Sequence, residues 1–259
     1  MRAHIRAVTL AIASTVMWLW AGISGADETV IDEVLDNIER GELELGWSGA
    51  IRATYFSRRG NSKEEDWGLS LSWKYNLEGP WQFDGLISGM SESTNDSTSD
   101  EEYLFRNAAK YYRTDTTYYV GRANYEKDRF AGIEEEALGV LGYGRELFRR
   151  KNHKLVGEAG GGFLWSKDAA GESDSGATGY AAAFYDWQMT EHSAFRQLIG
   201  VRYSEFDSNW KLTSKSEVKA EIIGNLSGVF SYEIKRNSEV ADGTANSDFY
   251  TNFGLEYSF

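Results

Sequence analysis

The 259-residue sequence contains no cysteine, a single proline and only three histidines. Without cysteine the chain can form neither disulfides nor a lipid-modified N-terminal cysteine, which excludes a disulfide-stabilised scaffold and a lipoprotein. Proline lacks the N–H donor of a β-ladder, so its scarcity favours long hydrogen-bonded strands. Because histidine is also scarce, we predict neither an enzyme nor a metal site, and no cofactor.

Basic residues are few as well. The sequence has 27 lysines and arginines against 40 aspartates and glutamates, a formal net charge of -13. Nucleic-acid phosphates require a basic face on the protein that binds them. A nucleic-acid-binding function is therefore excluded.

Long apolar runs are limited to one, from Ala7 to about Ala21, which follows the basic start around Arg2 and Arg6. A membrane-spanning helix needs about 20 apolar residues, and this run is shorter. It ends in small residues that suit signal peptidase. We predict a signal peptide over residues 1–26, cleaved between Ala26 and Asp27.

Residues 27–41 are acidic, with apolar residues such as Val30, Val34 and Ile38 at helical spacing. They predict a short periplasmic helix, or equally a solvated tail that orders only weakly.

From residue 42 onward the apolar period changes to two. In Asp66 to Leu77, six apolar residues that begin with Trp67 alternate with polar residues and glycine. Twelve strand residues rise roughly 40 Å, and a tilted transmembrane strand needs about 9 to 11. This length and alternation indicate a strand that crosses a bilayer.

The same pattern recurs, so residues 42–259 are predicted to form one all-β domain, a transmembrane antiparallel up-and-down β-barrel of about twelve strands. The segments lie near 43–57, 66–77, 81–89, 101–113, 116–127, 136–148, 153–167, 176–189, 193–206, 209–222, 225–236 and 247–259. An even count is the rule in bacterial barrels and returns both chain ends to the periplasm.

The connections alternate in length, as in barrels with short periplasmic turns and longer outside loops. Long polar loops are predicted near 57–65, 91–100, 126–135, 166–175 and 236–246. Aromatic residues gather near both predicted strand ends, for example Trp73 and Trp81 at one and Trp67 and Tyr103 at the other. They indicate two interfacial girdles, or merely the general preference of strands for aromatics.

The last predicted strand places Phe253, Leu255, Tyr257 and Phe259 on one face. A terminal aromatic preceded at two-residue steps by Tyr, Leu and Phe resembles the assembly signal of outer-membrane barrels. The resemblance implies the barrel-assembly machinery as a partner.

The segment from Tyr118 to Phe148 combines a strand ending in Tyr125, then Asp128-Arg129-Phe130, then a glycine-rich returning strand. It resembles the YdiY-like family of salt-induced outer-membrane proteins, a domain family of unknown function. The resemblance implies an outer-membrane barrel with a stress association and offers no established catalytic residues. We expect Asp128 to pair with Arg129 at the loop entrance and Phe130 to anchor the rim, with ligand binding as the alternative.

Even-numbered positions are predicted to face the lumen. The cations among them are Lys74, Arg106, Lys110, Arg122, Arg196 and Arg202, beside acidic residues such as Asp84 and Glu126. Barrels of about eight strands are filled and those of 16 or more are open, so about twelve strands leave both states possible.

We therefore predict a monomer in the outer membrane of a Gram-negative cell, in contact with its lipids and lipopolysaccharide. It would be a narrow channel for small solutes or a structural stress-response protein. Two alternatives stay open: a lipid-modifying hydrolase, suggested by the neighbours His192 and Ser193, and a secreted soluble barrel that binds an apolar ligand. The acidic runs 100–102 and 134–136 could hold divalent cations, or be solvated loops.

Overall fold

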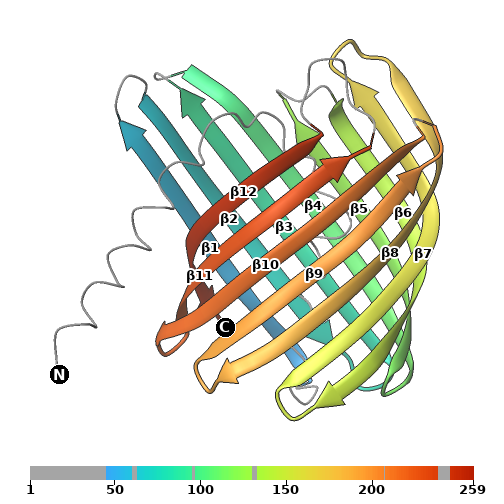
Figure 1. The fold of residues 1–259 in the computed structure, drawn as a ribbon. Coiled ribbons are helices and arrows are strands. Elements are labelled where there is room, and N and C mark those ends of the chain that lie inside the picture. The colour runs from blue at the N-terminus through green and yellow to red at the C-terminus, as the bar shows by residue number, and fades with distance from the viewer. Residues whose placement is uncertain (1–44, 60–62, 95–96, 130–132, 207, 239–245) are drawn as a thin grey trace, which may run out of the picture.

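The structure is a computed structural model that describes residues 45–59, 63–94, 97–129, 133–206, 208–238 and 246–259. These residues form twelve strands (Figure 1). In chain order the strands are β1 (Gly46–Arg59), β2 (Lys63–Asn76), β3 (Trp81–Thr94), β4 (Ser97–Thr114), β5 (Thr117–Asp128), β6 (Ile133–Arg150), β7 (His153–Asp168), β8 (Ser173–Thr190), β9 (Ser193–Ser204), β10 (Asn209–Ile223), β11 (Leu226–Asn237) and β12 (Ser247–Ser258).

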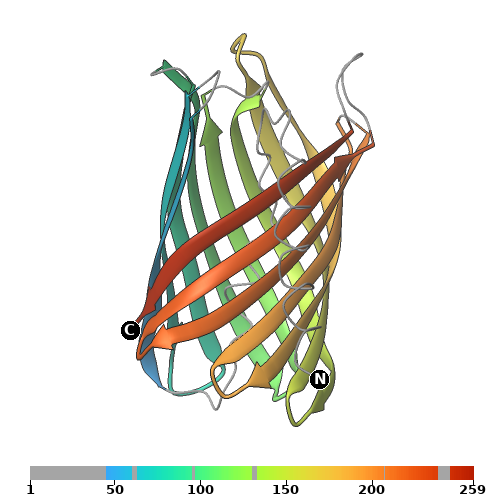
Figure 2. The ribbon, with the colours of Figure 1, turned by 60° about the vertical axis from the view of Figure 1, so that its left-hand side comes forward.

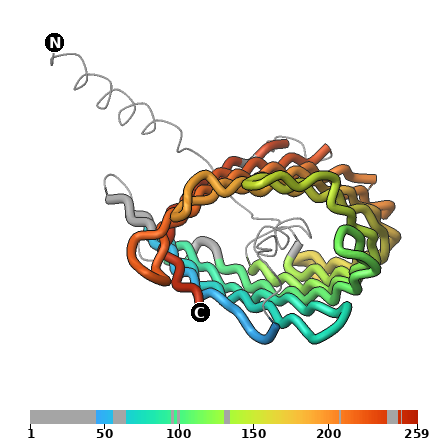
Figure 3. The backbone as a smooth tube through the Cα atoms, turned by 90° about the horizontal axis from the view of Figure 1, so that it is seen from below, coloured from blue at the N-terminus to red at the C-terminus, as the bar shows by residue number. Residues whose placement is uncertain are grey.

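Each strand pairs antiparallel with its neighbour in sequence, and β12 returns to pair with β1, which closes the barrel. Viewed along the axis, the backbone forms a flattened ring (Figure 3). The predicted fold class, an up-and-down antiparallel barrel of twelve strands, is confirmed.

No helix within the described residues has both the length and the apolar character to cross a membrane. The predicted signal peptide, its cleavage site at Ala26 and Asp27, and the helix or tail at 27–41 lie outside the described residues.

The outer face of the barrel is apolar and the inner face is polar. On β2, for example, Leu69 is 54% exposed, whereas its neighbour Ser70 is half-buried. Most of the buried side chains are polar or charged. This arrangement is the reverse of the soluble barrel considered above, and it suits a sheet surrounded by hydrocarbon, which hides its polar groups inside.

The two ends of the barrel differ. We call the end that carries both Gly46 and the C-terminus the turn end, where residues 115–116, 151–152, 191–192 and 224–225 each connect two strands. The opposite end is the loop end. There the strands continue into all five segments predicted as loops; β3, for example, reaches Thr94 and β4 begins at Ser97. The alternation of apolar and polar residues stops where the hydrocarbon stops, whereas backbone pairing between strands continues beyond it.

The even-numbered rule for the lumen holds except on β10 and β11. Ser204 of β9 pairs with Asn209 of β10. Paired residues point to the same face, so the inward positions change from even-numbered on β9 to odd-numbered on β10. The pairing of Leu226 with Tyr257 changes them back. Inward residues of β10 and β11 are therefore odd-numbered, and the rule needs correction there.

Candidate functional site: the interior of the barrel

The six cations predicted for the lumen all lie on the inner face. Arg106, Lys110, Arg122, Arg196 and Arg202 are buried, and Lys74 is half-buried. The interior divides into two parts: the filled side, formed by the inner faces of β4 to β9, and the seam side, formed by β10 to β12 and β1 to β3.

A single carboxylate, that of Glu158 on β7, organises the filled side. Its two oxygens accept hydrogen bonds from Arg122 Nη2 at 2.8 and 2.9 Å, from Arg122 Nε at 3.2 Å, and from the hydroxyls of Tyr118 and Tyr180 at 2.8 Å each. The Arg122 and Glu158 side chains are fully buried. This network ties β5, β7 and β8 together across the interior.

Glycines on β6 make that network possible. Arg122 is on β5 and Glu158 on β7, so the two must meet across the intervening strand. A Cβ at Gly144 would collide with the Tyr118 ring, and one at Gly142 with the Tyr180 hydroxyl. The absence of side chains at these positions lets both tyrosines approach β6 closely.

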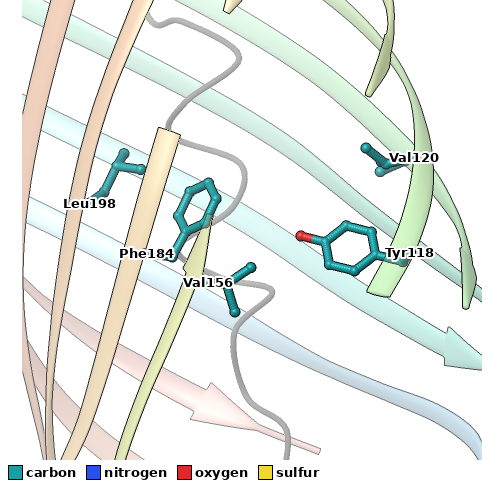
Figure 4. Packing of buried hydrophobic residues seen from close by; sticks show 6 residues of the cluster. Tyr118, Val120, Val156, Phe184 and Leu198 are labelled. Atoms are coloured by element: carbon teal, nitrogen blue, oxygen red, sulfur yellow. The ribbon is translucent and has the colours of Figure 1, made fainter. Parts of the chain in front are cut away.

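Apolar side chains fill the space next to this network. Val120, Val156, Phe184 and Leu198 pack with Tyr118 inside the barrel (Figure 4). A second cluster of Leu138, Val140, Leu164 and Tyr180 lies against Phe206. Nearer the loop end, Arg202 Nη1 contacts Glu136 Oε1 at 2.6 Å, joining β9 to β6. The filled side is thus packed like a protein core.

The seam side has a different centre, an ion-pair cluster of Arg52, Arg196, Glu217, Lys219 and Glu256. Arg52 Nη1 lies 3.0 Å from Glu217, and Arg52 Nη2 lies 2.6 Å from Glu256. Lys219 Nζ lies 2.6 Å from Glu256, and Arg196 Nη1 lies 3.6 Å from Glu217. With three cations and two carboxylates, the cluster has a formal charge of +1.

Three pockets line up on this side. The loop-side pocket of about 170 Å³ includes Arg52. The turn-side pocket of about 110 Å³ includes Arg196, Lys219 and Glu256. A wider pocket of about 410 Å³ at the turn end shares Lys219 with it. The ion-pair cluster therefore separates the first pocket from the other two.

Of the five residues in this cluster, sequence reasoning named Arg196 and missed the other four. Glu217 and Lys219 lie on β10, where the parity is switched, and so do Lys211 and Lys215. Aligning the strands by their outward apolar residues, such as Trp210 and Leu212 on β10, would have found them. Arg52 and Glu256 follow the even-numbered rule, but nothing in the sequence distinguishes them from other inward residues.

The C-terminal motif lies at the seam of the barrel. Phe253, Leu255, Tyr257 and Phe259 are exposed on the outer face. The backbone N–H and C=O of Phe259 bond to Gly49 on β1 at 2.8 Å each, and a Cβ at Gly49 would collide with the Phe259 ring. The motif residues thus flank or form the pairing that closes the barrel.

The Asp128-Arg129-Phe130 motif lies at the loop end. Asp128 is buried and ends β5, while Arg129 Nη1 contacts Glu101 Oε2 of β4 at 2.7 Å. The ion pair of Arg129 thus bridges to β4 and is not the expected one with Asp128. Phe130 lies outside the described residues. From the two acidic runs, the side chains of Glu101, Glu135 and Glu136 pair with cations, and Glu102 and Glu136 are buried.

The histidines face separate partners. His192 Nδ1 lies 2.7 Å from Glu221 Oε2, and the Ser193 hydroxyl lies 2.7 Å from the Thr190 hydroxyl. His153 Nδ1 lies 2.7 Å from the Tyr185 hydroxyl. The Ser193 hydroxyl is therefore oriented by Thr190, and the geometry lends no support to the His192 and Ser193 pair as a catalytic dyad.

Comparison with known proteins gives one family and several similar structures. The family described as "Protein of unknown function, DUF481" matches residues 51–259. "Uncharacterized protein YdiY" of Escherichia coli (strain K12) is 26% identical over 243 residues, which cover 93% of each chain.

Among solved structures, an outer-membrane channel from Pseudomonas putida F1 superposes with a TM-score of 0.54 at 10% identity, covering 86% of this chain and all of that one. The translocator domain of the autotransporter NalP from Neisseria meningitidis gives 0.52 at 11% identity, covering 97% and 98%. The fold is shared with outer-membrane barrels.

Proposed function

We propose that this chain, a member of the DUF481 family of proteins of unknown function, is a narrow outer-membrane channel for small solutes. The observation that carries the proposal is the set of three pockets on the seam side, with the Arg52 ion-pair cluster between the first and the other two among the described residues. The filled side contributes a packed wall.

The size of the pockets limits the solute. A water molecule takes a share of about 30 Å³ in the liquid, so pockets of about 170 and 110 Å³ hold only a few waters each. A path of this kind suits inorganic ions and the smallest polar metabolites. Arg52, which bonds to carboxylates on β10 and β12, is the constriction.

The charge that lines the two smaller pockets favours anions. Arg52, Arg106 and Lys215 line the loop-side pocket, and Lys74, Arg196 and Lys219 line the turn-side pocket. Among the described lining residues, one carboxylate opposes them in each pocket, that of Glu102 in the first and that of Glu256 in the second. Rings of charged side chains set the selectivity of pores, and an excess of cations attracts anions.

Planar-bilayer recording of the purified, folded protein tests the proposal. Replacing Arg52 with alanine removes the side chain that separates the pockets, while Arg196 and Lys219 still neutralise Glu217 and Glu256. We expect a larger single-channel conductance and a weaker preference for anions. The matched control, Arg202→Ala on the filled side, is expected to leave both unchanged.

Silence of the wild-type protein and of Arg52→Ala across repeated insertions would refute the channel and favour a structural role in the envelope. In the channel proposal the barrel acts as a monomer among outer-membrane lipids and lipopolysaccharide, after assembly through its C-terminal strand.

A further inference from the structure

The seam of the barrel is paired over only part of its length. β1 and β12 are joined from Ala50 with Ser258 to Thr54 with Gly254, and by the bonds between Gly49 and Phe259. All other neighbouring strands are joined over at least eleven residue pairs. Towards the loop end β12 leans away from β1, as Figure 2 shows.

Both strands keep their other partner beyond this point. β1 pairs with β2 as far as Arg59, and β12 pairs with β11 as far as Ser247. The described residues therefore leave two facing strand edges, 55–59 and 247–253, without pairing to each other. At about 3.3 Å per residue, these edges are roughly 17 and 23 Å long.

The separation begins at the membrane interface. Tyr55 and Phe253, the first residues beyond the pairing, face outward and are 66% and 67% exposed. Trp67, which pairs with Tyr55, is also exposed. Aromatic belts lie at the level of the lipid head groups, so the head group of a neighbouring lipid is at the right height to meet this part of the seam.

The loop-side pocket lies directly behind the separation. Thr54 lines it from β1, and Asn252 and Gly254 line it from β12. The alternation of β12 turns Asn252 inward, yet this residue is exposed. Gly68 pairs with Thr54 on the other side of β1. The residues that border the pocket at the start of the separation are therefore small, except for Asn252.

The lining of the pocket is amphipathic. Arg52, Arg106 and Lys215 provide cationic groups beside one lining carboxylate, Glu102. Arg52 and Lys215 also pair with carboxylates outside the lining, Arg52 with Glu217 and Glu256 and Lys215 with Glu233. Leu86, Met90 and Val229 provide apolar surface. Guanidinium and ammonium groups bind phosphate, and the apolar residues suit the part of a lipid next to its head group.

We propose that the separation between β1 and β12 is a lateral portal through which the phosphate head group of an anionic membrane lipid enters the loop-side pocket. The acyl chains stay in the bilayer against Tyr55 and Phe253. A strand from a second protein could also cover the two edges, but it would leave the charged pocket unexplained. The portal does not depend on conduction through the barrel.

The methionines of the chain give a direct test. After the predicted cleavage only Met90 and Met189 remain, because the other two are Met1 and Met17. Met90 lines the pocket, whereas Met189 lies near the turn end of β8. Protein made with photo-methionine is placed in nanodiscs of phosphatidylethanolamine with phosphatidylglycerol, irradiated, and mapped for lipid adducts. Variants Met189→Leu and Met90→Leu assign each adduct.

We expect a phosphatidylglycerol adduct at Met90, enriched over its share of the bilayer. Asn252→Trp, which fills the portal, should abolish it, and the adjacent outward control Thr251→Trp should not. Lys215→Gln should reduce the enrichment. Both tryptophan variants are first checked for heat-modifiable gel migration.

Three results would overturn the portal: no lipid at Met90 in the wild-type protein, an adduct that Asn252→Trp leaves unchanged, or a protein–protein adduct in its place. Equal labelling by both lipids would overturn the anionic assignment. Because labelling needs no conduction, failure of the channel and failure of the portal are separate outcomes.

Discussion

Replacing Glu158 with leucine is expected to destabilise the barrel by about 3–5 kcal/mol, the usual effect of removing one partner of a buried ion pair. The side chains of Glu158 and Arg122 are both fully buried, and the carboxylate also accepts the hydroxyls of Tyr118 and Tyr180. Leucine is close to glutamate in size, so the loss reflects charge and hydrogen bonding more than a cavity.

Denaturant titration of the protein folded in lipid vesicles measures this loss. The folded fraction is followed by the gel migration of unheated samples, and the free energy of unfolding is extrapolated linearly to zero denaturant. Glu135→Gln is the matched control. Glu135 contacts Lys127 at 3.3 Å in a partly exposed pair, and such surface pairs contribute little to stability because solvent screens them.

A double variant separates the charge effect from packing. Arg122→Met with Glu158→Leu removes both charges, and we expect it to regain most of the stability that Glu158→Leu loses. The reasoning is refuted if Glu158→Leu falls within about 1 kcal/mol of the wild-type protein, or if the double variant is no more stable than the single one.

Three further predictions use the same assay or its cellular form. Gly144→Ala should destabilise by about 1–3 kcal/mol through overpacking against a tyrosine ring, whereas Gly139→Ala, which meets open space, should be tolerated; equal effects would contradict this. Leu69→Arg should destabilise by up to about 2–4 kcal/mol because it faces lipid, and Ser70→Arg should do so less. The reverse order of stabilities would show that the outer and inner faces are assigned the wrong way round. Deleting Phe259 removes two seam hydrogen bonds and should lower the fraction of heat-modifiable barrel in outer membranes, which an unchanged fraction would disprove.

The strands could be predicted because each must present apolar side chains to lipid on one face and polar side chains to the interior on the other. That demand produces the unbroken alternation from Trp67 to Tyr75 on β2. Strand ends such as Ser97 on β4 could not be predicted, because beyond the hydrocarbon nothing requires apolar residues. The sequence there resembles a loop although the ladder continues.

The interior was predictable in kind but not in detail. Arg122 was expected inside, yet its pairing with Glu158 depends on β6 presenting glycine between them. Glu217 was missed because the connection of β9 to β10 switches the inward parity. The contact of Arg52 with Glu217 and Glu256 depends on barrel closure, which brings together residues 165 and 204 positions apart.

The short seam also has a consequence for the order in which the barrel is made. Eleven of the twelve strand pairings are hairpins between neighbours in sequence, and closing a short loop loses little chain entropy. Only the junction of the first and last strands must bring distant parts of the chain together. We therefore expect a sheet that is complete in every hairpin but still open to precede closure, and among the described residues six backbone pairs between β1 and β12 turn it into a cylinder.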